Sequence, residues 1–585
     1  MLPLISIQNL CVGFRQEGKL SPALHEISFT VDRGETVAIV GESGSGKSVT
    51  SLAVLQLLPT PPAEYTSGSI RFSEDGKEGV DLLQLHEQEM QSLRGSKIAM
   101  IFQEPMTSLN PLYTCGDQVM EAILLHQNIN SIAAKQKTIA LFEKARLPNP
   151  PDMFNRFPHE ISGGQKQRVM IAMAMSCEPS LLIADEPTTA LDVTVQQNIL
   201  HLIKELQVEK DMGVIFISHD LGLVADIADR VIVMFKGRIV EQNTIREIFS
   251  NAQHPYTKAL LSCRPALHPK GERLPVVSDF MEVNDDGSIV GKEKEGVMAN
   301  TFSNDQNSKR ALNDKIDINK KQPLLQVENL RVWFPGKRKI WSKQSRYVKA
   351  VDDVSFDIYE GETVGLVGES GCGKTTLSRS LLRLIEPTAG RLRFRDNDLL
   401  SLSSNRMRSM RKDMQIIFQD PYSSLNPRLS VGSALQEGLR IHGLGESYRS
   451  RKDIIINILE KVNLNADHYD RFPHEFSGGQ RQRIGIARAL ALNPSFIICD
   501  ESVSALDVSV QAQVLNLLND LKKEFHFTAL FISHDLSVVR YISDRILVMY
   551  NGKIVETGSA EAIYNTPQTD YSKKLVAAIP KGILQ

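Results

Sequence analysis

The chain has 585 residues, too many for one hydrophobic core at roughly 100–200 residues per domain, so we expect several domains. Its composition, 42% hydrophobic and 23% charged with a formal net charge of −2, is typical of soluble globular proteins and provides no basic field for nucleic acid. No run of about 18 uncharged apolar residues occurs, and the first residues lack the pattern of a signal peptide. The six cysteines form no C-x-x-C pair, which predicts incidental thiols in the cytosol rather than a zinc or disulfide framework.

The first informative segment is a glycine-rich loop that follows the apolar run 35–40 and precedes a helix expected from Lys47. Its sequence, Gly41-Glu-Ser-Gly-Ser-Gly-Lys-Ser48, matches the nucleoside-triphosphate P-loop. Glycines let backbone N–H groups turn toward phosphate oxygens, and the helix adds its positive N-terminal end. We expect Lys47 to hold the β- and γ-phosphates and Ser48 to bind Mg²⁺. The predicted nucleotide-binding residues of this loop are Gly41, Ser43, Gly44, Gly46, Lys47, Ser48 and Val49.

Further along the first half, polar groups follow short apolar runs. The run 181–184 ends in Asp185-Glu186, where the aspartate is placed to hold Mg²⁺ through water and the glutamate to accept a proton from attacking water. Ser162-Gly-Gly-Gln165 is predicted to open a helix, with Ser162 as its N-cap and Gly164 allowing close approach of a phosphate. His219 follows the run 214–217. Taken alone, each motif also fits an ordinary turn, helix cap or structural histidine.

The second half repeats these motifs, and the repetition favours the functional interpretation. The offset is 327 positions from Lys47 to Lys374 and 315 from Asp185 to Asp500. Because the offset falls to 316 at Gln103 and Gln419, about eleven extra residues lie before Gln103, with the polar loop 73–79 a candidate for many of them. The repeated residues are the P-loop 368–375 with predicted contacts Gly368, Ser370, Gly371, Gly373, Lys374, Thr375 and Thr376, and then Ser477, Gly479, Asp500, Glu501 and His534.

Short apolar strands alternate with helices in each half, a pattern typical of an α/β fold with a mainly parallel sheet and ligands at the strands' carboxyl ends. We predict a first domain over 1–265 and a second over 323–585. The segment between them, 266–322, is rich in Asn, Asp, Lys, Ser and Gly, which predicts a flexible linker with patches of order.

With Ser-Gly-Gly-Gln and then Asp-Glu after each P-loop, the chain resembles the ATP-binding cassette (ABC) family almost throughout both halves. The resemblance implies two tandem cassettes, each with a mainly parallel sheet core, an antiparallel β part and a helical signature subdomain, packed head-to-tail. Each ATP then lies between one P-loop and the other domain's signature. The family's Q-loop, D-loop and switch positions fall on Gln103, Gln419, Asp192, Asp507, His219 and His534.

The resemblance therefore implies two composite sites for ATP and Mg²⁺. The catalytic residues are Glu186, Glu501, His219 and His534, and the metal residues are Ser48, Gln103 and Asp185 in one site and Thr375, Gln419 and Asp500 in the other. Ser477 and Gly479 complete the site of the first P-loop, and Ser162 and Gly164 that of the second. Phe14 and Phe334 occupy the place of the aromatic that stacks on adenine, with Trp333 as a rival in the second half.

Twin-cassette proteins fall into three classes: the ATPase pair of a membrane transporter, a soluble protein acting on ribosomes, and a nucleic-acid repair ATPase. A nucleic-acid repair ATPase would bring zinc cysteines or coiled-coil insertions, and a ribosome-acting protein typically has a long charged helical linker; neither pattern occurs here. The segments 102–111 and 418–427 and His254-Pro-Tyr-Thr are similar to the peptide and nickel importer subfamily. The fused order and the segment 500–507 are similar to ATP-binding subunits of bacterial glutathione importers, whereas 59–65 resembles a fused peptide-importer relative.

This resemblance implies an ATPase that converts ATP and water to ADP and phosphate and drives import of glutathione or small peptides. The implied partners are two integral-membrane permease subunits and, through them, a periplasmic substrate-binding protein, with no nucleic acid. The implied location is peripheral, on the cytoplasmic face of the bacterial inner membrane. Dipeptides, oligopeptides and nickel chelates remain alternative cargoes, and a soluble protein acting on ribosomes is the less favoured alternative function.

Four features of the sequence lie outside the repeated motifs or depart from the family pattern. The second tail reads Gln568-Thr-Asp-Tyr-Ser572, which we interpret as a degraded His-Pro-Tyr-Thr motif. Cys372 replaces Ser45 inside the second P-loop and raises the question of thiol sensitivity at that site. The basic stretch from Lys337 to Lys349 fits contact with anionic lipid or permease, or a solvated loop. The C-terminal cysteine cluster of some oligopeptide-importer ATPases is absent from the sequence, so no iron–sulfur site is expected.

Overall fold

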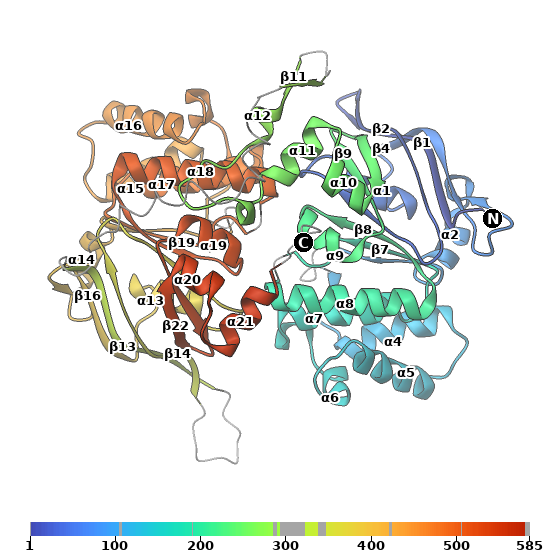
Figure 1. Cartoon of the computed structure of the whole chain (residues 1–585), viewed down its shortest axis with the longest axis horizontal. Helices are drawn as coiled ribbons and strands as arrows, with labels where there is room; N and C mark the ends of the chain where they lie inside the picture. The colour runs from blue at the N-terminus through green and yellow to red at the C-terminus, as the bar shows by residue number, and fades with distance from the viewer. Residues whose placement is uncertain are drawn as a thin grey trace.

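The chain is described from a computed structural model, which covers residues 2–103, 108–189, 191–284, 289–292, 322–336, 347–420, 424–504 and 506–579. Two α/β halves lie side by side, one from the N-terminal part of the chain and one from the C-terminal part (Figure 1). Most of the predicted linker (285–288 and 293–321) and most of the basic stretch (337–346) lie outside the described residues.

The core of the first half is a six-stranded sheet with the order β10-β9-β3-β8-β7-β6. Every neighbouring pair is parallel except β9 and β10. All five residues of β3 are buried and apolar or small, as expected for a parallel sheet covered on both faces. The strands are β3 (Thr36–Val40), β6 (Ile98–Ile101), β7 (Leu181–Asp185), β8 (Gly213–Ser218), β9 (Arg230–Phe235) and β10 (Arg238–Thr244). The predicted mainly parallel sheet is thus confirmed.

An antiparallel sheet with the order β2-β1-β4-β5 adjoins this core. Its strands are β1 (Ile5–Gln16), β2 (Lys19–Val31), β4 (Ala63–Phe72) and β5 (Val80–Asp81). The polar loop 73–79 joins β4 to β5, whereas the corresponding loop of the second half spans only 395–396. Part of the extra length predicted before Gln103 therefore lies in this loop.

Helices of the first half cover the sheet and form a separate helical part in which α4 packs on α5 and α7. They are α1 (Lys47–Val54), α2 (Glu87–Leu93), α4 (Cys115–His126), α5 (Ser131–Lys144), α6 (Pro150–Phe154), α7 (Gly163–Ala174), α8 (Val193–Lys210), α9 (Leu221–Ile227), α10 (Ile245–Asn251) and α11 (Pro255–Ser262). The helix α7 begins after Ser162, whose hydroxyl accepts a hydrogen bond from the Gln165 N–H, as the sequence predicts.

The second half repeats this architecture. Its core sheet has the order β18-β19-β20-β15-β21-β22, and its antiparallel sheet the order β14-β13-β16-β17. The strands are β13 (Pro323–Pro335), β14 (Tyr347–Tyr359), β15 (Thr363–Val367), β16 (Ala389–Phe394), β17 (Asn397–Asp398), β18 (Met414–Ile417), β19 (Phe496–Asp500), β20 (Thr528–Ile532), β21 (Arg545–Tyr550) and β22 (Lys553–Ser559). The helices are α13 (Lys374–Leu381), α14 (Ser404–Met410), α15 (Val431–Ile441), α16 (Tyr448–Lys461), α17 (Gly478–Leu490), α18 (Val508–Phe525), α19 (Leu536–Ile542), α20 (Ala560–Asn565) and α21 (Asp570–Ala577).

The segment after α11 runs along the second half before the undescribed residues begin. Leu274 is buried in the hydrophobic core of the second half, and both of its backbone groups bond to Asn516 of α18, at 3.0 and 2.8 Å. Arg273 pairs with Asp520 at 3.0 Å. The chain then forms α12 (Val277–Phe280) and the antiparallel pair β11 (Met281–Val283) and β12 (Ile289–Gly291). The tail of the first half is therefore anchored to the second half.

Within the described ranges, no helix combines the length and the apolar character needed to cross a bilayer.

Candidate functional site

The first P-loop connects β3 to α1 at the carboxyl edge of the core sheet. The Lys47 side chain is buried and its Nζ donates to the carbonyl oxygens of Gly41 and Glu42, at 2.7 and 2.9 Å. Gly41 has φ +153°, and a Cβ added there would lie 2.2 Å from the Met234 carbonyl oxygen, so the close approach of β9 requires glycine. The loop and the lysine thus adopt the compact arrangement expected of a phosphate cradle.

A cluster of polar side chains faces this loop from the ends of β7 and β8. Asp185, the last residue of β7, accepts a hydrogen bond from Ser48 at 3.2 Å. The carboxylate of Glu186 contacts Gln103 at 3.0 Å and His219 Nδ1 at 3.2 Å. Glu186 has φ +46°, a left-handed conformation that is costly for a residue with a side chain and is concentrated at functional sites. The structure therefore brings Ser48, Gln103, Asp185, Glu186 and His219 together.

Burial and the neighbouring charges set the protonation of this cluster. Burial raises the pKa of Asp185 to about 6, partly offset by the Ser48 hydrogen bond. Burial also acts to raise the pKa of Glu186, but the hydrogen bond and charge of His219 and the charge of Lys47 outweigh it and lower that pKa to about 2. Burial acts to lower the pKa of His219, yet Glu186 and then Asp507 of the other half raise it overall. Glu186 is thus held ionised beside a histidine that favours its charged form.

The second half assembles the same cluster with small differences. Lys374 Nζ donates to the Gly368 and Glu369 carbonyls, at 2.8 and 3.0 Å. Glu501 accepts from Gln419 at 2.7 Å and lies 3.6 Å from His534 Nδ1. Burial acts to raise the pKa of Glu501, but His534 and Lys374 lower it overall.

The two aspartates that precede these glutamates differ in their partners. Asp185 bonds to Ser48, the last residue of its P-loop motif, whereas Asp500 accepts from Ser378 one turn further along α13, at 3.1 Å. Asp500 Oδ1 is buried and has no hydrogen-bond partner among the described residues. A buried carboxylate oxygen without a partner is costly unless a cation or donor satisfies it. The site residues therefore fit an oxygen-ligated divalent cation.

Direct hydrogen bonds join the two halves at both P-loops. The Ser43 N–H donates to Asp507 Oδ2 at 2.9 Å, and the Ser370 N–H donates to Asp192 Oδ2 at 3.3 Å. Ser509 in the first turn of α18 donates to the Glu42 carboxylate. Thr194 is the counterpart of Ser509 in the first half, and its hydroxyl acts to lower the pKa of Glu369 in the second P-loop. Within the described parts of the chain, the Thr194 hydroxyl makes no hydrogen bond of ordinary geometry. Each P-loop is therefore in contact with the D-loop of the opposite half.

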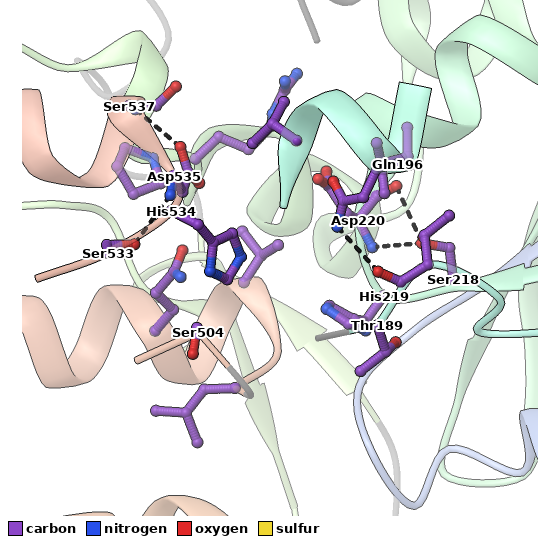
Figure 2. Close-up of a pocket in the computed structure, with 18 of the residues that line it drawn as sticks. Thr189, Gln196, Ser218, His219, Asp220, Ser504, Ser533, His534, Asp535 and Ser537 are labelled. Atoms are coloured by element: carbon purple, nitrogen blue, oxygen red, sulfur yellow. Dashed lines mark hydrogen bonds between the residues drawn. The ribbon is translucent and has the colours of Figure 1, made fainter. Parts of the chain in front are cut away.

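A cavity of about 110 Å³ lies between the halves next to these contacts. His219 and Asp220 line it from the first half, and His534 and Asp535 from the second (Figure 2). Burial raises the pKa of Asp535, and the charge of Asp220 from the other half adds to this rise. The residues after both switch histidines thus line the same cavity from opposite halves.

The signature helices α7 and α17 belong to opposite halves of the chain (Figure 1). Ser477 and Ser162 are exposed caps of these helices, and each hydroxyl accepts from the N–H three residues on. A Cβ at Gly479 would lie 2.6 Å from Val510, and one at Gly164 would lie 2.8 Å from Val195. These glycines therefore also permit packing against α18 and α8, a role that the sequence interpretation missed.

The predicted adenine-stacking aromatics occupy equivalent positions near the ends of β1 and β13. Phe14 is partly buried against the core of its half, whereas Phe334 is 39% exposed. Trp333 packs against Tyr347, with ring centroids 6.2 Å apart, and under the Lys349 ammonium. Phe334 is thus more open to a ligand than its rival Trp333.

Two tyrosines near the P-loops were not among the predicted site residues. The Tyr256 hydroxyl accepts a hydrogen bond of 2.9 Å from the Glu42 N–H, and the Tyr571 hydroxyl accepts one of the same length from the Glu369 N–H. The second tail, 568–572, departs from His-Pro-Tyr-Thr in sequence, yet it keeps one contact of that motif. Thr569 replaces His254 as the helix cap, and Tyr571 retains the contact of Tyr256. The sequence signal was available, because Tyr256 and Tyr571 are also 315 positions apart.

The fold and the P-loops define an ATPase with two cassettes, and comparison with known proteins identifies its family. A model described as ABC transporter matches residues 24–189 and 351–504, and a model of the oligopeptide/dipeptide transporter C-terminal region matches 240–282. The chain therefore belongs to the ABC transporter family, and it is an ATPase of that family.

Several curated relatives align over nearly the whole chain. The glutathione import ATP-binding protein GsiA of Pectobacterium atrosepticum is 46% identical over 584 residues, covering 99% of this chain and 90% of the relative. Its counterpart from Salmonella paratyphi A is 47% identical over 582 residues, covering 99% and 89%. Among solved structures, the dimeric ATP-binding cassette MJ0796 bound to ADP and Pi is 27% identical, covering 40% of this chain and 98% of that one, with a TM-score of 0.37.

Proposed function

We propose that this ATPase drives import of glutathione or small peptides through a separate membrane permease. The observation that carries the proposal is the identity of 46–47% over 99% of the chain to relatives named as glutathione import ATP-binding proteins. The matched oligopeptide/dipeptide transporter region at 240–282 supports the same class of cargo.

Two equivalent ATP sites lie between the halves in this proposal. The first P-loop, with Gln103, Asp185, Glu186 and His219, is completed by Ser477 and Gly479. The second P-loop, with Gln419, Asp500, Glu501 and His534, is completed by Ser162 and Gly164. The bonds from Ser43 to Asp507 and from Ser370 to Asp192 support this pairing, because they already link each P-loop to the opposite half.

Each site performs hydrolysis with its own carboxylate and histidine. Glu186 accepts a proton from the attacking water, and His219 holds that carboxylate while its ring contacts the γ-phosphate. Phosphate contacts from both halves favour the closed state, and cleavage to ADP and phosphate removes the bridge so that the halves separate. Glu501 and His534 act in the same way at the other site.

Magnesium fits the donor set of both sites. The oxygens come from Ser48, Gln103 and Asp185 in one site and from Thr375, Gln419 and Asp500 in the other. The strongest indication of a bound cation is Asp500 Oδ1, which is buried and has no hydrogen-bond partner among the described residues. When bound, Mg²⁺ neutralises charge that develops on the phosphates.

The partners follow from the class of transporter. Two integral-membrane permease subunits convert closure of the halves into alternating access, and a periplasmic binding protein selects the cargo. The chain then lies on the cytoplasmic face of the bacterial inner membrane as a peripheral subunit.

Phe14 and Phe334 stack on the adenines of the two bound nucleotides in this proposal.

A second candidate is a dipeptide or oligopeptide importer, favoured by the description of the family model that matches 240–282. Proteoliposomes that contain the chain, its permease subunits and the binding protein discriminate the candidates by ATP-driven uptake of labelled glutathione, dipeptide or nickel chelate. We expect glutathione uptake that is lost in Glu186→Gln. Uptake of dipeptide without glutathione favours the second candidate, and ATPase activity stimulated by ribosomes rather than by the permease contradicts both.

A further inference from the structure

In each P-loop, the first peptide unit is bonded at both ends. In the first half, the Gly41 carbonyl accepts from Lys47 Nζ at 2.7 Å, and the Glu42 N–H of the same peptide donates to the Tyr256 hydroxyl at 2.9 Å. A peptide unit is planar, so bonds at both ends fix its orientation. The second half repeats the arrangement with Lys374 at 2.8 Å and Tyr571 at 2.9 Å.

The tyrosine hydroxyls are themselves held rigidly. Tyr256 is fully buried, and its ring lies 4.5 Å from that of Phe235 at the end of β9. The His254 side chain caps α11 by accepting from the Tyr256 N–H. In the second half, the Tyr571 ring lies 4.3 Å from Tyr550. Burial raises the pKa of both phenols, so each remains a neutral acceptor for the loop N–H.

The next peptide unit of the loop is bonded at one end within its own half and at the other end to the opposite half. Lys47 Nζ also binds the Glu42 carbonyl at 2.9 Å, while the Ser43 N–H donates to Asp507 across the interface. Separation of the halves removes the bond to Asp507 but leaves the bond to Tyr256, which belongs to the same half as the loop. The tyrosine is therefore the contact that can keep the open loop ready for phosphate.

We propose that Tyr256 and Tyr571 are positioning residues that hold the P-loop of their own half in its phosphate-binding conformation. Their hydroxyls bond to the loop backbone, and the proposal rests on the ATP sites assigned above. Helix α11 also packs on α18 of the opposite half, and α21 on α8, so each tyrosine lies on a helix that contacts both halves. The geometry repeated in the two tails then has a function in ATP binding.

The test uses Tyr256→Phe in the full chain, since it removes the hydroxyl and keeps the buried ring. The loss leaves the Glu42 N–H without its acceptor, and we expect the KM for ATP to rise about three- to tenfold while kcat changes less than about twofold. Tyr541→Phe is the matched control, because it removes another buried hydroxyl, bonded at 2.7 Å to the Glu272 carbonyl away from the P-loops. Tyr541→Phe should leave the KM unchanged.

Binding of a fluorescent ATP analogue then resolves the two sites. With Lys374→Ala disabling the second P-loop, Tyr256→Phe should weaken binding about three- to tenfold. With Lys47→Ala disabling the first, Tyr256→Phe should have no effect. Equal weakening in both backgrounds, or unchanged affinity in the Lys374→Ala background, overturns the positioning role of Tyr256. Neither result contradicts the proposed ATP sites. Absence of nucleotide binding by the unsubstituted chain contradicts the proposed ATP sites as well.

Discussion

The carboxylate of Asp507 accepts a hydrogen bond of 2.9 Å from the backbone N–H of Ser43, which lies 464 positions earlier in the chain. The equivalent bond from Ser370 to Asp192 crosses the interface in the opposite direction at 3.3 Å. One backbone N–H in each P-loop therefore has its acceptor in the other half, and this bond requires the two halves to be in contact. Because the two bonds are related by the internal repeat, each P-loop is bonded to the opposite half in the same way.

The first prediction concerns the two glutamates beside the switch histidines. Glu186→Gln and Glu501→Gln each remove the proton acceptor while preserving size, and we expect each to lower kcat by at least about 100-fold, the lower limit for loss of a general base. We expect one substitution to be enough, which requires that hydrolysis at each site depends on the other site across the interface. Phosphate release measures the effect, with the exposed Glu209→Gln as control. A variant that retains half of the activity indicates independent sites.

The second prediction concerns the divalent cation. Chelation by EDTA should abolish phosphate release, and added Mg²⁺ should restore it, because the paired oxygens of Asp185 and Ser48 need a cation to approach phosphate. Asp500→Asn should raise the Mg²⁺ concentration needed for half-maximal activity. Turnover that persists in EDTA contradicts the assignment of Asp185 and Asp500.

The third prediction concerns the anchor of the tail on the second half. Asn516→Ala removes both bonds to Leu274 from a buried position and should lower the free energy of unfolding by about 2 kcal/mol. Asn519→Ala is the control, since its side chain makes one long bond, 3.4 Å to Tyr541, among the residues that the structure describes. Thermal unfolding and the rate of proteolysis between residues 263 and 281 report the effect. Equal unfolding temperatures for the two variants indicate that the tail is not anchored by Asn516.

The fourth prediction concerns Cys372 in the second P-loop. Only 7% of this residue is exposed, and burial raises the pKa of its thiol, so the reactive thiolate is scarce at neutral pH. We expect alkylation by iodoacetamide to be slower at Cys372 than at the partly exposed Cys11. Mass spectrometry of the modified chain measures both rates. Equal rates, together with loss of activity that Cys372→Ser prevents, indicate an accessible thiol at the site.

The residues that carry chemistry were predictable because their motifs are local. A strand, a glycine loop and a helix fix Lys47 within a few positions, and the constant offset of 315 placed Asp500, Glu501 and His534 in the second half. The structure confirms the mainly parallel sheets and brings Gln103, Glu186 and His219 into contact.

Contacts between distant segments were not predictable in the same way. The bond that the Glu42 N–H donates to the Tyr256 hydroxyl spans 214 positions, and its geometry depends on how α11 packs against β9. The sequence also gives no indication that Asn516 selects the backbone of Leu274, because a buried asparagine on a helix has many possible partners. Such contacts follow from the packing of the two halves, which no single motif encodes.

The composite nature of the ATP sites is tested most directly by a substitution in one half and nucleotide labelling in the other. Ser477→Arg places a bulky cation at the exposed N-terminus of α17, and a photoreactive ATP analogue with mass-spectrometric mapping reports labelling at each P-loop. The account predicts that Ser477→Arg lowers labelling at the Lys47 loop and spares the Lys374 loop, with Ser162→Arg giving the reverse. Loss of labelling at the Lys374 loop in Ser477→Arg would contradict it.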